Sequence, residues 1–483
     1  MGIFDFLKKK KTNTSTSPSR PAVIDTISKA DAITQAAAAA AEAKANEEMD
    51  ELTRIALAAG VETQDEGELD ADGLIRKALN AIESDDNATA IRCFRQAEKM
   101  GSLEAKRNLA RCYETGRGVG KDEPRAFKLY SDAAGAGCLA AYNNVGNCYI
   151  EGIGTPKDEK AGYEAFRTAA DKGEEVAMAN VAKCLMQGVG VEKNAEEGLK
   201  WFEKSAAAGN HLADFELGMT YLQFPEYRDK AEEGLKRVKQ AAEEGVLDAV
   251  LVMAQIHDEG GPQQNIQECM RWLNIAAEKG NKNAQCRLGQ ILMYGVGGVQ
   301  RDPQKGYHWL TFAAQQNYTP AIYILAELNL LYTNGNQDAM RMGLNQLTAC
   351  IKESYPPAFM LMGQCYLEGR AVMKDNAQAV KFFTLSAEHG NVNAELLLAK
   401  LYNGEVENAD FETNPAEARK WLEKVAEKGH PVALHDLAVM TLKDENSSED
   451  DRKAAADNLR KAAKAGYTAA LKTMTEYGIT ADL

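Results

Sequence analysis

The chain has 483 residues, of which 45% are hydrophobic and 7% aromatic, so it can bury a core that is poor in rings. Its formal net charge of −15 repels the phosphate backbone, which excludes nucleic acid as a partner. No apolar run approaches the ~20 residues that a transmembrane helix requires.

Residues 1–22 are predicted to be a basic flexible tail. Four lysines and Arg20 oppose Asp5, a net +4 that leaves −19 on the rest of the chain. Its apolar side chains come first and its lysines follow, in the order Phe4, Phe6, Leu7, Lys8, Lys9, Lys10 and Lys11. That order suits reversible contact with an anionic membrane surface. A short partner-binding motif and a disordered tail are the alternatives.

Residues 23–71 form the second predicted segment. The run from Ala36 to Ala41 favours a helix, because alanine has the highest helix propensity. With few large apolar residues, this helix is expected to pack weakly. Residues 61–71 are acidic and contain glycine, which predicts a linker to the segment that follows.

From about residue 72 a period of 35 to 39 residues begins, and it continues through residue 483. We call its marker residue the anchor, usually a glycine that is followed four residues later by alanine. The anchors are Gly101, Gly137, Gly173, Gly209, Gly245, Gly280, Asn317, Ser354, Gly390, Gly429 and Gly466. A period of this length indicates a repeat architecture, in which each unit packs only on its neighbours.

Each unit is predicted to hold two helices. Alanine four residues after the anchor and an apolar residue eight after it share one helical face. The next residue is alanine or glycine in the first ten units, which lets a second helix approach closely. Six units place a glycine fifteen residues after the anchor, where a helix end needs a left-handed residue. These glycines are Gly116, Gly152, Gly188, Gly260, Gly295 and Gly369.

The pattern resembles the Sel1-like repeat, a relative of the tetratricopeptide repeat. The fullest match runs from Leu109 to Asp122 and includes Tyr113, Gly116, Gly118 and Val119. The resemblance covers residues 72–483 with about ten repeats. It implies an all-α fold, a right-handed superhelical solenoid of antiparallel helix pairs whose first helices line a concave face. It also implies a scaffold or adaptor that binds proteins.

Several units depart from this pattern. The unit after Gly209 has Phe-Pro-Glu-Tyr in place of the glycine loop, and the units at Asn317 and Ser354 lack the anchor glycine. From about residue 434 the last unit carries a polar loop without glycine, which predicts a C-terminal cap. Residues 73–100 are predicted to form an N-terminal helix pair with the same role, because terminal repeats need a polar outer face.

No residue pattern supports catalysis, a cofactor or a metal site. The Gly-x-Gly-x-Gly run at Gly116 follows a helix and recurs in other repeats, so it is interpreted as a turn rather than a phosphate cradle. Cysteines at four positions eleven after an anchor alternate with Ile, Leu and Met in other units, which indicates a core position. The nine cysteines show no disulfide or CxxC zinc spacing, so we expect thiols in the reducing cytoplasm.

A polar row on the first helices of three units is the candidate binding site. It occupies positions seven and ten after the anchor, namely Asn108, Arg111, Asn144, Asn147, Asn180 and Lys183. A spacing of three puts each pair on one face. Asparagine amides bond both C=O and N–H of an extended peptide, and Arg111 and Lys183 suit a carboxylate. The alternative is a solvated helix face. In the middle units, where Val252, Ile324, Leu361 and Leu397 stand here, the groove is either narrower or binds an apolar strip.

Two functional hypotheses follow. The first is a cytoplasmic scaffold that holds a partner protein or peptide in the concave groove. The second is a membrane-surface adaptor tethered by the tail. An enzyme would need a site within residues 1–71, which carry no catalytic signature. The partner's identity and the oligomeric state are left open.

Overall fold

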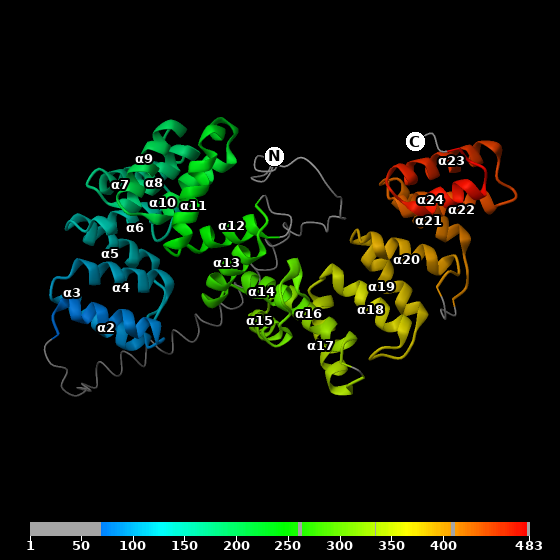
Figure 1. The fold of residues 1–483 in the computed structure, drawn as a ribbon. Coiled ribbons are helices and arrows are strands. Elements are labelled where there is room, and N and C mark those ends of the chain that lie inside the picture. Colours follow the sequence, from blue (N-terminus) through cyan, green and yellow to red (C-terminus); the bar gives the residue numbers. More distant parts are fainter. Residues whose placement is uncertain (1–68, 259–262, 334, 407–410, 481–483) are drawn as a thin grey trace. The chain divides into compact units, whose positions relative to one another are not determined.

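The computed structural model describes residues 69–258, 263–333, 335–406 and 411–480. Throughout these ranges all regular structure is helical, and the chain divides after Asn265 into two compact units (Figure 1). The proposed tail at 1–22 and the alanine-rich segment lie outside the described residues, as does Gly260. The acidic linker lies outside them up to residue 68.

The first unit contains eleven described α-helices and one 3₁₀ helix. In chain order they are α2 (Ala71–Glu83), α3 (Asn87–Lys99), α4 (Leu103–Thr115), α5 (Glu123–Gly135), α6 (Leu139–Glu151), α7 (Glu159–Ala170), α8 (Glu175–Gln187), α9 (Ala195–Ala207), α10 (His211–Gln223), η2 (Pro225–Lys230), α11 (Ala231–Glu243) and α12 (Leu247–His257). Every α-helix from α2 to α11 packs against the next α-helix along the chain.

The second unit continues in the same manner. Its described helices are α13 (Ile266–Glu278), α14 (Lys282–Tyr294), η3 (Val296–Gly298), α15 (Pro303–Gln315), α16 (Thr319–Leu331), α17 (Gln337–Lys352), α18 (Pro356–Glu368), α19 (Asn376–Glu388), α20 (Val392–Tyr402), α21 (Pro415–Ala426), α22 (Pro431–Lys443), α23 (Glu449–Lys464) and α24 (Thr468–Glu476). Each α-helix again packs against the next. Both units therefore have the paired-helix solenoid architecture that the repeat pattern predicts.

Small residues bring the two helices of a repeat together. A Cβ atom at Gly146 in α6 would lie 2.5 Å from ring carbons of Phe166 in α7, and Gly363 stands in the same relation to Phe383. Real Cβ atoms do not approach so closely, so a side chain here would push the pair apart. The glycine nine residues after the anchor is therefore kept for packing, at a cost in helix propensity of about 1 kcal/mol.

The anchor ends the second helix of each repeat in a left-handed turn. Gly101 has φ +90° and Gly137 has φ +102°, yet nothing lies within 4 Å of a Cβ atom added at either position. Backbone conformation, not space, thus selects glycine. Asn317 and Ser354 keep φ at 55° and 54° despite their side chains, so the two units without an anchor glycine retain the turn.

The Gly-x-Gly loop closes one repeat against the preceding one. Gly116 caps α4 with φ 74°, as the turn interpretation requires. The second glycine makes a close inter-repeat approach, because a Cβ atom at Gly154 would lie 2.1 Å from the backbone oxygen of Glu123, the first residue of α5. Gly190 approaches Glu159 of α7 in the same manner. Close backbone–backbone packing thus explains the glycines at positions 154 and 190.

The loop's aspartate begins the next helix. The backbone amide of Asp122 donates to the carbonyl of Tyr113 at 2.8 Å, which closes the loop. Its side chain then accepts from the amide of Arg125 at 3.0 Å and caps α5. The same cap recurs at Asp158, Asn194, Asp302, Asp375 and Asn414. An N-cap of this kind typically contributes about 1 kcal/mol.

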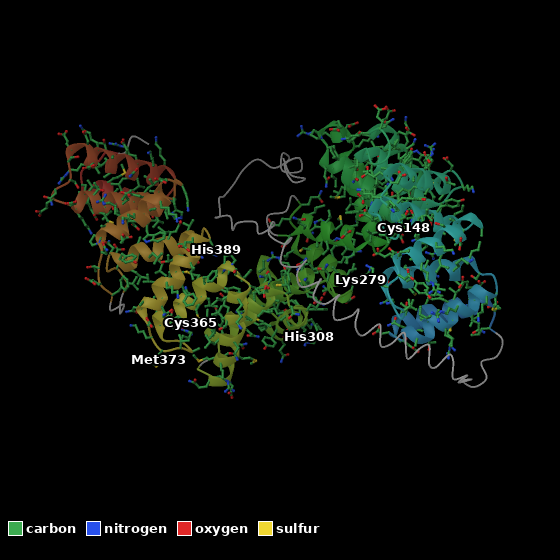
Figure 2. All side chains as sticks on the ribbon, turned by 180° about the vertical axis from the view of Figure 1, so that it is seen from behind. Cys148, Lys279, His308, Cys365, Met373 and His389 are labelled. Atoms are coloured by element: carbon green, nitrogen blue, oxygen red, sulfur yellow. The ribbon has the colours of Figure 1, made fainter. Side chains whose placement is uncertain are left out.

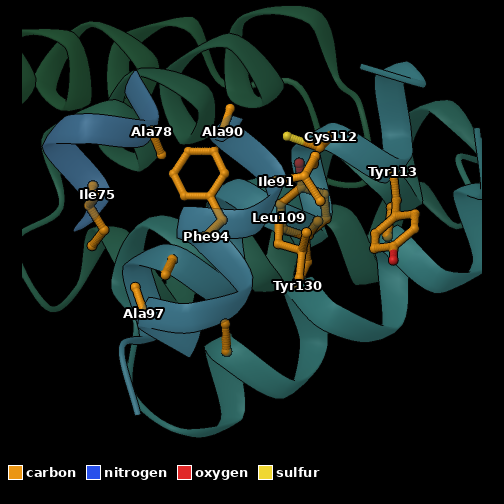
Figure 3. Close-up of a cluster of buried hydrophobic side chains, with 14 of the residues drawn as sticks. Ile75, Ala78, Ala90, Ile91, Phe94, Ala97, Leu109, Cys112, Tyr113 and Tyr130 are labelled. Atoms are coloured by element: carbon orange, nitrogen blue, oxygen red, sulfur yellow. The ribbon is translucent and has the colours of Figure 1, made fainter. Parts of the chain in front are cut away.

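The core is a chain of small clusters between successive helices. Figure 3 shows Phe94, Leu109 and Tyr130, from α3, α4 and α5, in the cluster nearest α2. The alanines four residues after the anchor are buried throughout, with exposed fractions from 0% to 2%. Cys148 in α6 and Cys365 in α18 (Figure 2) are each 1% exposed, which confirms that their position is a core position.

The irregular units keep the helix pair but change the connection. After α10 the chain forms the 3₁₀ helix Pro225–Lys230 in place of the glycine loop. The polar loop before α23 ends in a capping box between Ser448 and Asp451. The last described helix, α24, buries Ala470 and Met474 against the α22–α23 pair.

Candidate functional site

The polar row lies on three successive first helices of the first unit. Asn108 and Arg111 belong to α4, and the corresponding pairs belong to α6 and α8. The helices α6 and α8 contact each other, and the amide of Asn180 donates to Oδ1 of Asn143 at 2.5 Å. The first helices α6 and α8 are therefore close enough for their side chains to interact.

Two members of the row are engaged within the chain. Besides the bond from Asn180 to Asn143, Lys183 Nζ lies 2.8 Å from Oε1 of Glu216 in α10. Glu216 occupies position seven of the following repeat. Lys183, which was expected to bind a ligand's carboxylate, is therefore already paired with a carboxylate of this chain. This ion pair is about one-third exposed on each side, and such pairs contribute roughly 0–1 kcal/mol.

The other four members make no side-chain hydrogen bond or ion pair with another residue that the structure describes. Arg111 and Asn147 are exposed, and Asn144 is half-buried. Asn108 differs, because only 7% of its surface is exposed. The sequence predicts an open face for Asn108, whereas the structure places it in the lining of a cavity.

This cavity lies between α2, α3, α4 and the turn after α4. Its volume is about 550 Å³, within the range of ~300–1,000 Å³ typical of small-ligand sites. Its polar lining combines Asn108 and Arg111 with Asp85, Asn87 and Arg117. The sequence analysis did not identify Asp85, Asn87 and Arg117 as site residues. Asp85 precedes α3 and Asn87 begins it, while Arg117 lies in the glycine turn after α4. The only signal in the sequence is that one arginine lies in the last turns of α4 and another lies in the glycine turn that follows.

Two of the four apolar residues at the row's positions in the middle units are buried in the core. Ile324 and Leu361 are 5% and 2% exposed and belong to the core between helices. The expectation of an apolar strip there is wrong for these two residues, because neighbouring helices cover them. Val252 and Leu397 are half-buried.

Electrostatics around the cysteines favour packing over reactivity. Burial raises the pKa of the Cys112 thiol to about 11, although the positive charges of Arg111 and Arg117 oppose the shift. Burial likewise raises the pKa of Cys148 to about 12. A thiol with such a pKa is protonated at neutral pH and is a poor nucleophile or metal ligand.

Metal-binding clusters and membrane-spanning helices are both missing from the described residues. Within those ranges, His, Cys, Asp and Glu form no group of three or more arranged to hold a metal ion. None of the helices described above is long and apolar enough to cross a membrane. The membrane-contact residues proposed in the tail, from Phe4 to Lys11, lie outside the described part of the chain.

Comparison with protein families gives a match over more than half of the chain. The Sel1 repeat model matches residues 103–138, 139–174, 176–210, 248–281, 282–318, 357–391, 392–430 and 431–467. The two long gaps between matched segments hold α10–α11 and α16–α17, including the units after Gly209 and Asn317. No curated protein matches the chain.

Several solved structures resemble the chain. A protective antigen of uropathogenic Escherichia coli, described as having an SLR fold, is 21% identical with a TM-score of 0.46, over 88% of this chain and 97% of the antigen. A Sel1 repeat protein of Oxalobacter formigenes is 26% identical with a TM-score of 0.43, over 50% and 99%. An immunity protein of Pseudomonas aeruginosa is 19% identical with a TM-score of 0.34, over 45% and 83%.

Proposed function

The chain belongs to the Sel1 repeat family, and from this premise we propose that it is a scaffold whose helices α4, α6 and α8 bind a partner protein or an extended peptide. Sel1 and related repeats generally serve as scaffolds for protein–protein interaction, and such scaffolds are typically not enzymes. The nine cysteines, all present as thiols, support a reducing compartment such as the cytoplasm.

One observation carries this proposal. Four polar side chains on α4 and α6, the first helices of two successive repeats, are unengaged within the described chain, namely Asn108, Arg111, Asn144 and Asn147. Amide groups so placed supply both donors and acceptors for a peptide backbone. Lys183 and Asn180 are less available to a ligand, because Lys183 pairs with Glu216 of α10 and Asn180 bonds to Asn143 of α6.

The test is an affinity pull-down from native lysate, with bound proteins identified by mass spectrometry. The variant carries alanine at the four unengaged positions of the row. A matched control carries alanine at four exposed positions of α5 and α7: Lys128, Asp132, Lys160 and Glu164. Circular dichroism should show equal helicity in all three proteins.

The proposal predicts a partner that wild type and control retain and the row variant loses. Retention of every partner by the row variant would refute the row as the binding face. Substituting only Asn144 and Asn147 keeps the test independent of the cavity around Asn108.

The membrane-adaptor hypothesis rests on the order of apolar and basic residues in the tail. It predicts that the full chain sediments with vesicles containing phosphatidylserine but not with pure phosphatidylcholine vesicles. Removal of residues 1–11 should abolish sedimentation. Equal sedimentation of the truncated chain would exclude this role for the tail.

A further inference from the structure

The cavity between α2, α3 and α4 has a composition that specifies its ligand. We propose that it binds a carboxylate flanked by an aliphatic side chain, presented by the partner peptide. This inference rests on the proposed scaffold function and adds the chemical group that one end of the row recognises. Buried polar groups, positive charges and an apolar wall in the same cavity support it.

The cavity is lined by one buried amide side chain and by one buried amide oxygen that have no hydrogen-bond partner within the described part of the chain. Asn108 is 93% buried, lines the cavity, and its side chain has no hydrogen-bond partner among the described residues. Oδ1 of Asn87, at the start of α3, is also buried without a protein partner, while its Nδ2 donates to Asp85 at 2.9 Å. A buried polar atom left unmatched costs about 1–3 kcal/mol, so Oδ1 of Asn87 is expected to meet a partner. Together with the unpartnered amide of Asn108, it indicates a polar ligand.

The charges determine the sign of that ligand. Arg111 and Arg117 line the cavity, and neither forms an ion pair with a described residue. Both lower the pKa of the Cys112 thiol in the cavity wall against the effect of its burial, so their field reaches the interior. Asp85 contributes one negative charge, which leaves a net +1. A single carboxylate balances this charge, whereas a phosphate dianion exceeds it.

The apolar wall specifies the neighbouring group. Phe94 is fully buried behind the cavity, Ile82 is half-buried, and Leu79 remains 41% exposed. An exposed leucine beside a buried ring offers surface that an aliphatic side chain of a ligand would cover, at about 25 cal/mol per Å². Positive charge and apolar surface thus lie in the same site. Pockets that bind the C-terminal carboxylate or an acidic side chain of a peptide combine the same two features.

The experiment titrates the full chain with three peptides by calorimetry. One is acetyl-Ala-Ala-Leu with a free C-terminal carboxylate, the second is its C-terminal amide, and the third is acetyl-Ala-Glu-Leu-amide. We expect at least one carboxylate peptide to bind about tenfold more tightly than the neutral amide, the factor that one charge-assisted bond supplies. The tighter of the two identifies the source as a chain terminus or an acidic side chain.

Variants locate the binding. Arg111→Gln and Arg117→Gln should each remove most of the preference for carboxylate, and Asn108→Leu should weaken binding of all three peptides because it removes the amide that lines the cavity. Lys128→Gln, on the exposed face of α5, should change nothing. Circular dichroism and thermal unfolding confirm that each variant is folded.

Four results would overturn the assignment. Three of them are equal affinity for amide and carboxylate, a carboxylate preference that survives in both arginine variants, and tighter binding of inorganic phosphate than of either carboxylate peptide. Absence of binding by every peptide also overturns it. Such a failure leaves the scaffold proposal standing if substitution of Asn144 and Asn147 still removes a partner in the pull-down.

Discussion

At the residue scale, positive φ angles show that the turn at the end of each repeat requires a left-handed backbone whichever residue occupies it. Asn317 and Ser354 adopt the same left-handed turn as the anchor glycines. Left-handed backbone costs a residue with a Cβ atom roughly 1–2 kcal/mol, and asparagine tolerates it better than most. The two replacements therefore weaken their units without changing the fold.

Ser354→Gly should stabilise the second unit. Glycine removes the steric cost at φ 54° but loses more backbone entropy on folding, so we expect a net gain of about 1 kcal/mol. Urea unfolding monitored by circular dichroism measures the change. Gly101→Ala, at φ +90°, is the reciprocal control and should destabilise the first unit. A loss of stability in Ser354→Gly would contradict the explanation.

The cysteines should differ sharply in reactivity. Burial raises the pKa of six thiols to about 11 or 12, namely Cys112, Cys148, Cys184, Cys286, Cys350 and Cys365. Cys138, before α6, is only half-buried. Iodoacetamide at pH 8 should therefore modify Cys138 first in the native protein, as read by peptide mass spectrometry. All nine should react in urea, and early modification of Cys148 would refute the prediction.

The same thiols predict a loss of stability in alkali. Their folded pKa exceeds the value of 9.0 expected for the unfolded chain. As pH rises above about 9, the unfolded state releases these protons while the folded state retains them, so the free energy of unfolding falls. Thermal unfolding between pH 8 and pH 11 should show this decline, and a variant with Cys148→Ala and Cys365→Ala should show a shallower one.

At the element scale, close contacts between glycines and the facing helix set the geometry of each repeat. Gly146 lies against Phe166, whereas Gly135, at the end of α5, has nothing within 4 Å of the place that a Cβ atom would occupy. Both are helical glycines with negative φ, so they differ in packing rather than in backbone conformation. They provide a matched pair for separating packing from helix propensity.

Gly146→Ala should destabilise the first unit by roughly 1–3 kcal/mol, because its Cβ would overlap the Phe166 ring. Gly135→Ala should be stabilising, by up to about 1 kcal/mol, since alanine is the better helix former and meets no neighbour. Urea unfolding of the two variants beside wild type measures both effects. Stabilisation by Gly146→Ala would show that α6 and α7 are not held as close as the structure indicates.

At the scale of the whole molecule, the chain consists of two compact units, each held together by contacts between neighbouring helices. Solenoid stability is approximately a sum over repeats and their interfaces, so separate units need not unfold together. Sequence periodicity alone does not reveal this division, because the repeat spacing runs past Asn265 without a break.

The full chain is therefore expected to unfold in more than one step. Urea titration should give transitions that do not coincide when helicity and Trp fluorescence are compared, since the earliest tryptophan, Trp201, lies in the first unit and the other three lie in the second. Gly146→Ala should shift only the transition of the first unit. A single coincident transition that this substitution shifts as a whole would contradict the prediction.

The family, the paired-helix architecture and the roles of the repeated positions all follow from the amino-acid sequence alone. They do so because helix periodicity, left-handed turns and caps depend on residues within about fifteen positions of one another. The anchor and the alanine four residues after it also recur in eleven units, with the anchor glycine replaced in two of them. The Gly-x-Gly run is a turn, as its position directly after a helix predicts.

The side-chain contacts between neighbouring helices are determined only by the tertiary structure. In the structure, Lys183 pairs with Glu216, Asn180 bonds to Asn143, and Asn108 lines a cavity together with Arg117. Ile324 and Leu361 are buried. These contacts join residues of different helices, up to 37 positions apart. Whether such side chains meet depends on how neighbouring helices pack, and a repeat period specifies which residues are equivalent but not the distances between them.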